Sequence, residues 1–199
     1  MCGRFEAFTR EQIEEVLEDI REGRVRPMPA DPSPVHARPG AETTVIGPAD
    51  LELRNLHWGT QHPKDKTLMI NARIESAGFT TWKNAFETSR VIVPARAYFE
   101  PHENETERIN GRDRKRQYRF CSPENVPLLL AGVALEGKLA IVTTDAREDI
   151  AGIHPRMPLC LTVEDAHKWI GGAWSEIQLA PPMEIAAQPE FGGQQLSLF

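Results

Sequence analysis

The feature that most constrains how this chain can fold is a succession of short apolar runs separated by turn-forming residues. Each run has the length and the β-branched or aromatic character of a strand. The runs are Thr44–Ile46, Leu51–Trp58, Val91–Val93, Tyr118–Cys121, Leu128–Leu135 and Leu139–Thr143. Because few helical segments lie between them, we expect an α+β fold around a mainly antiparallel sheet.

Three segments carry helical signals. Thr9 and Gln12 form a capping box, and apolar residues then recur at helical spacing until Gly23. Residues 81–88 read as a short helix, and Thr162 with Asp165 begins another that ends at Gly171–Gly172. The five prolines within residues 26–42 predict an extended or turning loop there.

The length of 199 residues suits a single domain, which we place at residues 1–180, followed by a flexible tail at residues 181–199. Apolar stretches long enough to cross a bilayer and a signal-peptide layout are both missing from the sequence, so we expect a cytoplasmic location. We also expect a monomer. The net charge of −6 argues against a uniformly basic surface, so any nucleic-acid site must be a local basic groove.

The three cysteines, Cys2, Cys121 and Cys160, are widely spaced and form no C-x-x-C pair. We therefore expect neither a zinc site nor a disulfide framework, and no cofactor. Cys121 and Cys160 are interpreted as small buried hydrophobic residues.

Cys2 differs from the other cysteines because it directly follows the initiator methionine and precedes Gly3. Methionine is normally trimmed before a small residue, which would leave Cys2 with a free α-amine beside its thiol. An α-amine has a pKa of about 7.7–8.0, so part of it is neutral and nucleophilic at pH 7. It can form a Schiff base with an aldehyde, and the thiol can then close a thiazolidine ring. On its own, Cys2 is more simply interpreted as a chance cysteine near the start of the chain.

Four segments occur in order: MCGRF at the start, NARIES at residues 71–76, VPARAYFEP at residues 93–101 and TTDAREDIAGIHPRMP at residues 143–158. Together they resemble the SOS response-associated peptidase (SRAP) family, whose members cross-link abasic DNA through an N-terminal cysteine. The resemblance covers the chain to about Ile170 and implies a barrel-like sheet core.

The resemblance implies catalytic roles for Cys2, Asn71, Glu100 and His154. Cys2 matches the nucleophile, and the Asn71 amide can fix the amine or a sugar oxygen. Glu100 follows an apolar run, so desolvation can raise its pKa toward that of a general acid or base. His154 can shuttle a proton. Alternatively, Asn71 is a helix cap and Glu100 a surface residue at a strand end.

The resemblance also implies a DNA-binding surface. Its arginines, Arg4, Arg73 and Arg156, suit phosphates because a guanidinium binds in two places and stays charged. Alternatively, each arginine is an ordinary salt-bridge partner, and Trp58, expected to stack on a base, is a core residue. The further residues of this surface are Pro39, Thr143, Thr144 and Met157.

The chain departs from the family pattern at Pro101, where tryptophan is usual, and at Pro155, where an acidic residue is common. Residues 102–117 mix both charge signs and read as a solvated hairpin tip. Its basic cluster Arg112–Arg116 could instead touch the flank of the DNA.

The final residues are similar to the short peptide by which bacterial repair proteins bind the sliding clamp. Such peptides place a glutamine at a pocket rim and bury leucine and phenylalanine in an apolar cleft. The matching residues are Gln195, Leu196, Leu198 and Phe199. Clamp binding would bring the protein to replication forks. Alternatively, the tail docks on its own domain.

The sequence therefore predicts covalent capture of abasic sites in single-stranded DNA. One rival is a cysteine peptidase, with Cys2 as acyl nucleophile and His154 as base, which would need no free α-amine. A second rival is a non-catalytic DNA-binding adaptor held by its tail to the clamp.

Overall fold

The computed structural model describes residues 2–48, 51–62, 64–79, 81–177, 179 and 183–190. The helices are α1 (Arg10–Arg21), α2 (Lys83–Thr88), α3 (Glu148–Ala151) and α4 (Val163–Gly171), with 3₁₀ turns η1 (Ile74–Ser76) and η2 (Trp174–Glu176). The strands are β1 (Phe5–Ala7), β2 (Val35–Ala37), β3 (Glu42–Ile46), β4 (Leu53–Trp58), β5 (Thr60–Gln61), β6 (Leu68–Met69), β7 (Asn71–Arg73), β8 (Arg90–Ile109), β9 (Arg112–Cys121), β10 (Leu128–Leu135), β11 (Lys138–Asp145), β12 (Arg156–Pro158), β13 (Cys160–Leu161) and β14 (Ala186–Pro189).

A closed barrel forms the centre of the fold. Neighbouring strands pair in the order β10, β11, β4, β3, β8, and β8 pairs again with β10, which closes the ring. Within the ring only β11 and β4 run parallel. The expected α+β fold with a mainly antiparallel, barrel-like sheet is confirmed. Among the helices in the described residues, none is long and apolar enough to span a membrane.

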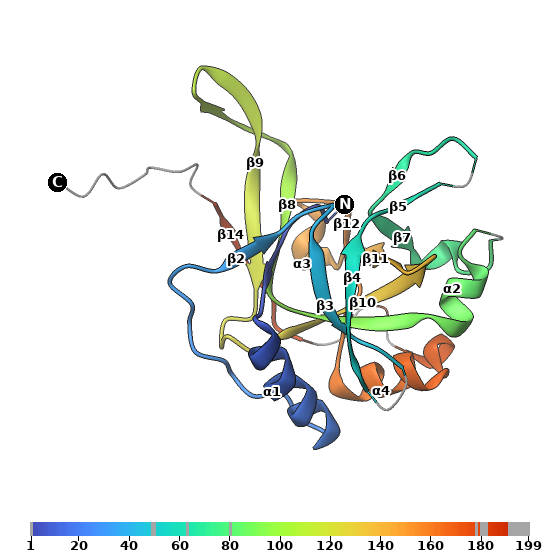
Figure 1. Ribbon diagram of the computed structural model, residues 1–199. Helices are drawn as coiled ribbons and strands as arrows, with labels where there is room; N and C mark the ends of the chain where they lie inside the picture. Colours follow the sequence, from blue (N-terminus) through green and yellow to red (C-terminus); the bar gives the residue numbers. More distant parts are fainter. Residues whose placement is uncertain are drawn as a thin grey trace.

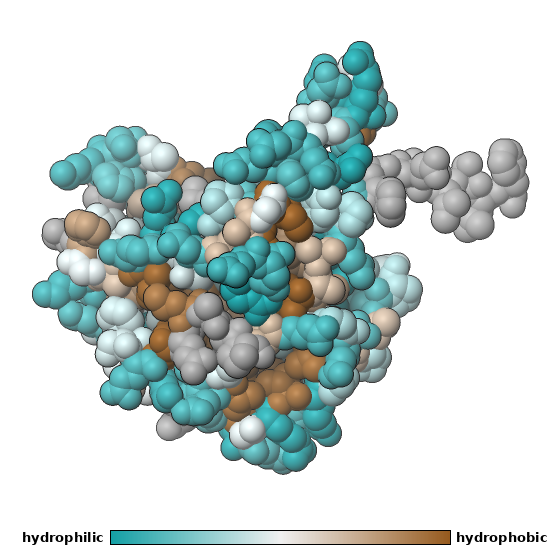
Figure 2. Space-filling model, turned by 180° about the vertical axis from the view of Figure 1, so that it is seen from behind, coloured by the Kyte–Doolittle hydropathy of each residue, from teal (hydrophilic) through white to brown (hydrophobic). Residues whose placement is uncertain are grey.

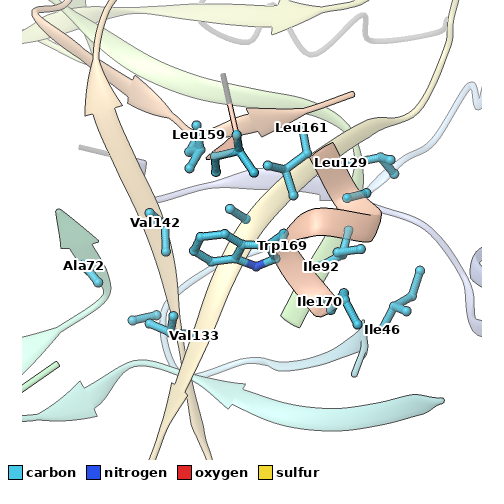
Figure 3. Close-up of a cluster of buried hydrophobic side chains, with 14 of the residues drawn as sticks. Ile46, Ala72, Ile92, Leu129, Val133, Val142, Leu159, Leu161, Trp169 and Ile170 are labelled. Carbon is cyan, nitrogen blue, oxygen red and sulfur yellow. The ribbon is translucent and has the colours of Figure 1, made fainter. Parts of the chain in front are cut away.

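Two apolar layers line the barrel wall. The inner layer fills the barrel and includes Cys2, Trp58 and Tyr98. The outer layer lies between the wall and the helices, and Trp169 of α4 lies at its centre, surrounded by aliphatic side chains (Figure 3). The indole Nε1 of Trp169 donates to the Val91 carbonyl oxygen at 2.9 Å, which ties α4 to β8.

The helix boundaries follow from the caps that the sequence predicts. Thr9 and Gln12 form the reciprocal capping box of α1. Thr162 accepts a hydrogen bond from the Asp165 amide at the start of α4, and Gly172 ends that helix with a left-handed φ of 101°. Helices α1 and α4 cover one end of the barrel, while α2 lies to its side (Figure 1).

The structure differs from the sequence expectations in three segments. The expected hairpin at residues 102–117 is present, but strands β8 and β9 extend through it, far beyond their apolar runs, and it projects from the barrel (Figure 1). Part of the proline-rich segment pairs with β1 as β2. Ala186–Pro189, expected in the tail, pair with β9 as β14, so the sheet continues past residue 180.

Candidate active site

Cys2 lies just before β1, with its side chain fully buried in the inner layer. Its thiol donates to the Arg4 carbonyl oxygen at 3.6 Å. Burial, followed by the nearby Glu100 charge, raises the pKa of the Cys2 thiol well above its ordinary value. The sulfur is therefore held as a neutral thiol.

Asn71 lies beside Cys2, although 69 positions separate them in the chain. Its Nδ2 donates to the Cys2 carbonyl oxygen at 3.0 Å. The parallel pairing of β7 with β11 places Asn71 opposite Ile141 and carries it to the barrel wall. Among the described residues, the buried Oδ1 of Asn71 has no hydrogen-bond partner. Asn71 lies in a strand, so the helix-cap alternative is wrong.

Glu100 lies two residues after Tyr98, in the part of β8 that pairs with β9, and its side chain is 1% exposed. Burial raises the pKa of this carboxyl from its ordinary 4.5 to about 7. At neutral pH it can therefore both donate and accept a proton. The surface alternative for Glu100 is wrong.

His154 follows α3, and its Nε2 lies 3.9 Å from Oε2 of Glu100. Its Nδ1 lies 2.7 Å from the Arg156 carbonyl oxygen and 3.1 Å from the Arg156 amide nitrogen. The two contacts require different tautomers. In either tautomer, Nε2 is the ring nitrogen that faces Glu100. Burial lowers the pKa of His154, so the neutral ring is favoured at neutral pH. Pro155 does not prevent this approach.

Two of the three expected phosphate-binding arginines are engaged with carboxylates. Arg4 forms a bidentate pair with Glu190 and lies over the Phe99 ring at 3.7 Å. Arg156 donates to Glu75 at 2.8 Å and to Asp145. Arg73 is exposed and forms no ion pair within the described residues.

The other expected DNA contacts are less accessible. Trp58 is fully buried, donates from Nε1 to the Ile70 carbonyl oxygen at 2.8 Å and packs on Phe5. The expectation of an exposed, stacking indole is therefore wrong, and the core alternative holds. The side chains of Thr143, Thr144 and Met157 are also buried, and Pro39 is half-buried.

Sequence reasoning missed Tyr98, which is fully buried in the inner layer. Its ring stacks on Phe120 with centroids 4.8 Å apart. Burial raises its pKa, with smaller contributions from Cys160, Glu100 and Cys2, so the hydroxyl lies among the site residues. Within the described part of the chain this hydroxyl has no hydrogen-bond partner. Its position two residues before Glu100 in a strand was the signal that places it on the same face.

Within the described residues, no group of three or more histidine, cysteine or acidic side chains is arranged to hold a metal ion. The side chains brought together are instead a thiol, an amide, a carboxyl whose pKa lies near neutral pH, and a neutral imidazole. Such a set suits nucleophilic attack assisted by proton transfer.

Comparison with known proteins identifies the family of the chain. A family model described as SOS response associated peptidase (SRAP) matches residues 1–190. The chain is 31% identical over 205 residues to "Abasic site processing protein YedK" of Escherichia coli (strain K12), covering 94% of this chain and 86% of that one. It is 26% identical over 190 residues to "Abasic site processing protein YoqW" of Bacillus subtilis (strain 168), covering 85% and 80%.

The fold is likewise similar to a solved structure. The crystal structure of a phage-related protein from Bordetella bronchiseptica superposes with a TM-score of 0.70 at 26% identity, covering 95% of this chain and 94% of that one. The family match and the two sequence relatives span most of the chain. The chain therefore belongs to the SOS response associated peptidase (SRAP) family.

Proposed function

We propose that this chain captures abasic sites in single-stranded DNA by a covalent bond to Cys2, once the residue before it has been removed. The observation that carries the proposal is the convergence of Asn71, Glu100 and His154 around Cys2. The names of the relatives, which refer to abasic site processing, support DNA as the substrate.

The chemistry balances without a redox partner. The Cys2 amine adds to C1′ of the ring-opened sugar and gives a carbinolamine. Loss of one water leaves a Schiff base. The thiol then adds to the same carbon, its proton moves to nitrogen, and a thiazolidine results. The net reaction joins the two molecules and releases one water.

Glu100 and His154 supply the proton movements. With a pKa of about 7, Glu100 can protonate the ring oxygen of the closed sugar and free the aldehyde. The carbinolamine hydroxyl needs a proton to leave as water, and the Glu100–His154 pair can provide it. The Asn71 amide binds the Cys2 carbonyl and so orients the amine. The thiazolidine would shield the lesion from strand cleavage during replication and the SOS response.

A cysteine peptidase with the same residues is less well supported. Acyl transfer needs a thiolate, whereas burial raises the pKa of the Cys2 thiol. In aldehyde capture the amine attacks first, so a neutral thiol is no obstacle. One peptidase-like step is an exception to this argument. If the protein removes residue 1 by itself, the general base of the site would act on the peptide bond before Cys2.

The test mixes mature protein with a single-stranded oligonucleotide that carries one abasic site and separates the products by denaturing electrophoresis. The wild type should give a shifted band without reduction. Cys2→Ala keeps an α-amine but no sulfur, so it should give a band only when borohydride traps the Schiff base. Cys121→Ala, which makes the same change at another buried cysteine, should behave like the wild type.

An added residue before Cys2 separates the remaining alternatives. It should abolish the unreduced band, whereas a peptidase would still cleave its peptide. Retention of the band in that variant, or in Cys2→Ala without reduction, would refute thiazolidine capture. A non-catalytic adaptor predicts that Cys2→Ala binds and acts as the wild type does.

The tail adds a proposed partner. Gln195, Leu196, Leu198 and Phe199 lie outside the described residues, so this partner is inferred from their likeness to clamp-binding peptides. Binding of the full chain to a purified bacterial sliding clamp should be lost in Leu198→Ala with Phe199→Ala. Ser197→Ala, between the anchors, should bind normally. Equal binding by all three proteins would remove the clamp from the proposal.

A further inference from the structure

A groove of about 550 Å³ opens beside the candidate active site, between the N-terminal segment and the β8–β9 hairpin. Gly3 and Arg4, which directly follow Cys2, line one side. Arg114 and Lys115 of β9 line the other, together with Arg38 and Glu190. The groove therefore starts at the residue next to the nucleophile and runs along the hairpin.

Two arginines of the hairpin that lie outside the groove are paired with carboxylates. Arg116 pairs with Glu105 at 3.2 Å, and Arg108 pairs with Asp113 at 3.7 Å. In contrast, Arg114 and Lys115 form no ion pair with any described carboxylate; Lys115 donates only to the Glu103 carbonyl oxygen. Glu107 lies opposite Arg114 in the ladder and is the hairpin's own carboxylate at the groove.

Arg38 likewise forms no ion pair within the described part of the chain. Three cations without carboxylate partners thus face one groove, in a protein whose net charge is −6. Figure 2 shows the protruding hairpin as almost wholly hydrophilic, so apolar docking there is not indicated. Surplus local cations on an acidic body are suited to a polyanion.

Arg4 is the exception, because Glu190 occupies its guanidinium. Glu190 is held in place by β14, and its amide donates to the Gln117 carbonyl oxygen at 2.8 Å. A carboxylate that grips a guanidinium in two places presents the same geometry as a phosphate. Glu190 therefore occupies a position on Arg4 that also suits a phosphate.

The hairpin is long enough to follow a DNA strand. From Arg112 to Gln117 the strand β9 extends by about 17 Å, at about 3.3 Å per residue. Phosphates along one strand of a duplex are about 3.4 Å apart along the axis. Several phosphates of the flanking DNA can thus lie along the groove.

We propose that this groove binds the phosphate backbone of the DNA that flanks the abasic site, and that Glu190 competes with a phosphate for Arg4. The inference rests on the proposed function, since it assumes that DNA reaches Cys2. It adds a binding surface of this chain's own, made of Arg38, Arg114 and Lys115, and a carboxylate that weakens binding.

The test measures affinity for a labelled, undamaged single-stranded oligonucleotide by fluorescence anisotropy over a range of salt concentrations, which separates binding from cross-linking. Arg114→Ala with Lys115→Ala should weaken binding, and the slope of log affinity against log salt should fall by about 0.7 for each lost phosphate contact with a single strand. Arg108→Ala removes a cation of the same hairpin that does not line the groove, and its affinity and slope should match the wild type.

Glu190→Gln should act in the opposite direction and tighten binding, because it frees Arg4 without removing the side chain. Wild-type affinity and slope in the Arg114 and Lys115 variant would overturn the groove. Unchanged or weaker binding by Glu190→Gln would overturn the competition. If DNA binds with these sensitivities but no adduct forms, only the cross-linking proposal fails. If adducts form and the variants bind like the wild type, only the groove fails.

Discussion

The inner and outer layers of the barrel wall are both apolar, but they treat buried polar groups differently. In the outer layer, buried Asp19 binds Arg26 at 2.8 Å, and buried Arg90 donates to the Trp169 carbonyl oxygen at 2.5 Å. In the inner layer, the Tyr98 hydroxyl and the Asn71 Oδ1 have no partner among the described residues, and Glu100 has a raised pKa. Buried polar groups are normally satisfied. The outer layer thus serves stability, whereas, under the proposed function, the polar groups beside Cys2 are the ones that meet the substrate.

The largest expected effect comes from breaking the outer layer. Trp169→Ala should lower the free energy of unfolding by about 3–5 kcal/mol, because it leaves a cavity and removes the bond to Val91. Urea unfolding measures the loss. Phe79→Ala, at an aromatic residue that is 67% exposed, should change stability by no more than about 0.5 kcal/mol. A small loss of stability in Trp169→Ala would contradict the assignment of stability to the outer layer.

Glu100→Gln tests the inner layer through the pH dependence of stability. The folded state holds the Glu100 proton up to a pKa of about 7, against an ordinary 4.5, so folding binds a proton in that interval. The stability of the wild type should therefore fall as pH rises from about 4.5 to 7, by up to about 3 kcal/mol from this group, at about 1.4 kcal/mol per pKa unit.

The amide side chain that replaces Glu100 in this variant does not titrate, so the variant's stability should exceed that of the wild type at pH 8 and lose that advantage near pH 4. Unfolding curves at both pH values measure the difference. Adduct formation should fall at every pH, because the general acid is gone. Equal pH dependence in the two proteins would contradict the raised pKa.

Tyr98→Phe should raise the free energy of unfolding, by less than the effects expected for Trp169→Ala and Glu100→Gln. Removing a buried hydroxyl that lacks a partner among the described residues relieves a desolvation cost of roughly 1–3 kcal/mol while the stacking on Phe120 is kept. Thermal unfolding of the variant and the wild type measures the gain. Lower stability in Tyr98→Phe would mean that the hydroxyl is satisfied in the folded protein.

The smallest effect is expected at a helix cap. Thr162→Ala should lower stability by about 1 kcal/mol, because the Asp165 amide loses its acceptor. Thr106→Ala, an exposed position on the hairpin, serves as the matched control in the same denaturant series. Adduct formation at 25 °C should be unaffected in both, and a loss in Thr162→Ala alone would link α4 to the site.

Much of the fold could be predicted from local signals. The strand β10 coincides with its apolar run, and the caps at Thr9 and Thr162 place α1 and α4. The reach of β8 and β9 could not be predicted, because residues 102–117 are polar and are held as strands by their pairing with each other. The strand β14 was missed for a related reason: four residues carry little pattern and depend on β9.

The proximity of Cys2, Asn71, Glu100 and His154 could be anticipated only through the ordered motifs, since no spacing rule joins strands that distant. The residues that surround this group could not be anticipated from the motifs. The pairing of Arg4 with Glu190 spans 186 positions. The burial of Trp58 depends on the closure of the barrel around it, which its neighbours in the chain do not reveal.

The complete enclosure of the Cys2 side chain bears on how long a linkage made there would last. Competing nucleophiles in solution, such as hydroxylamine, would have to enter by the path that the DNA itself takes. While the DNA occupies that path, attack on the joined carbon requires local opening of the protein. Mild denaturant should therefore hasten release more than added nucleophile does.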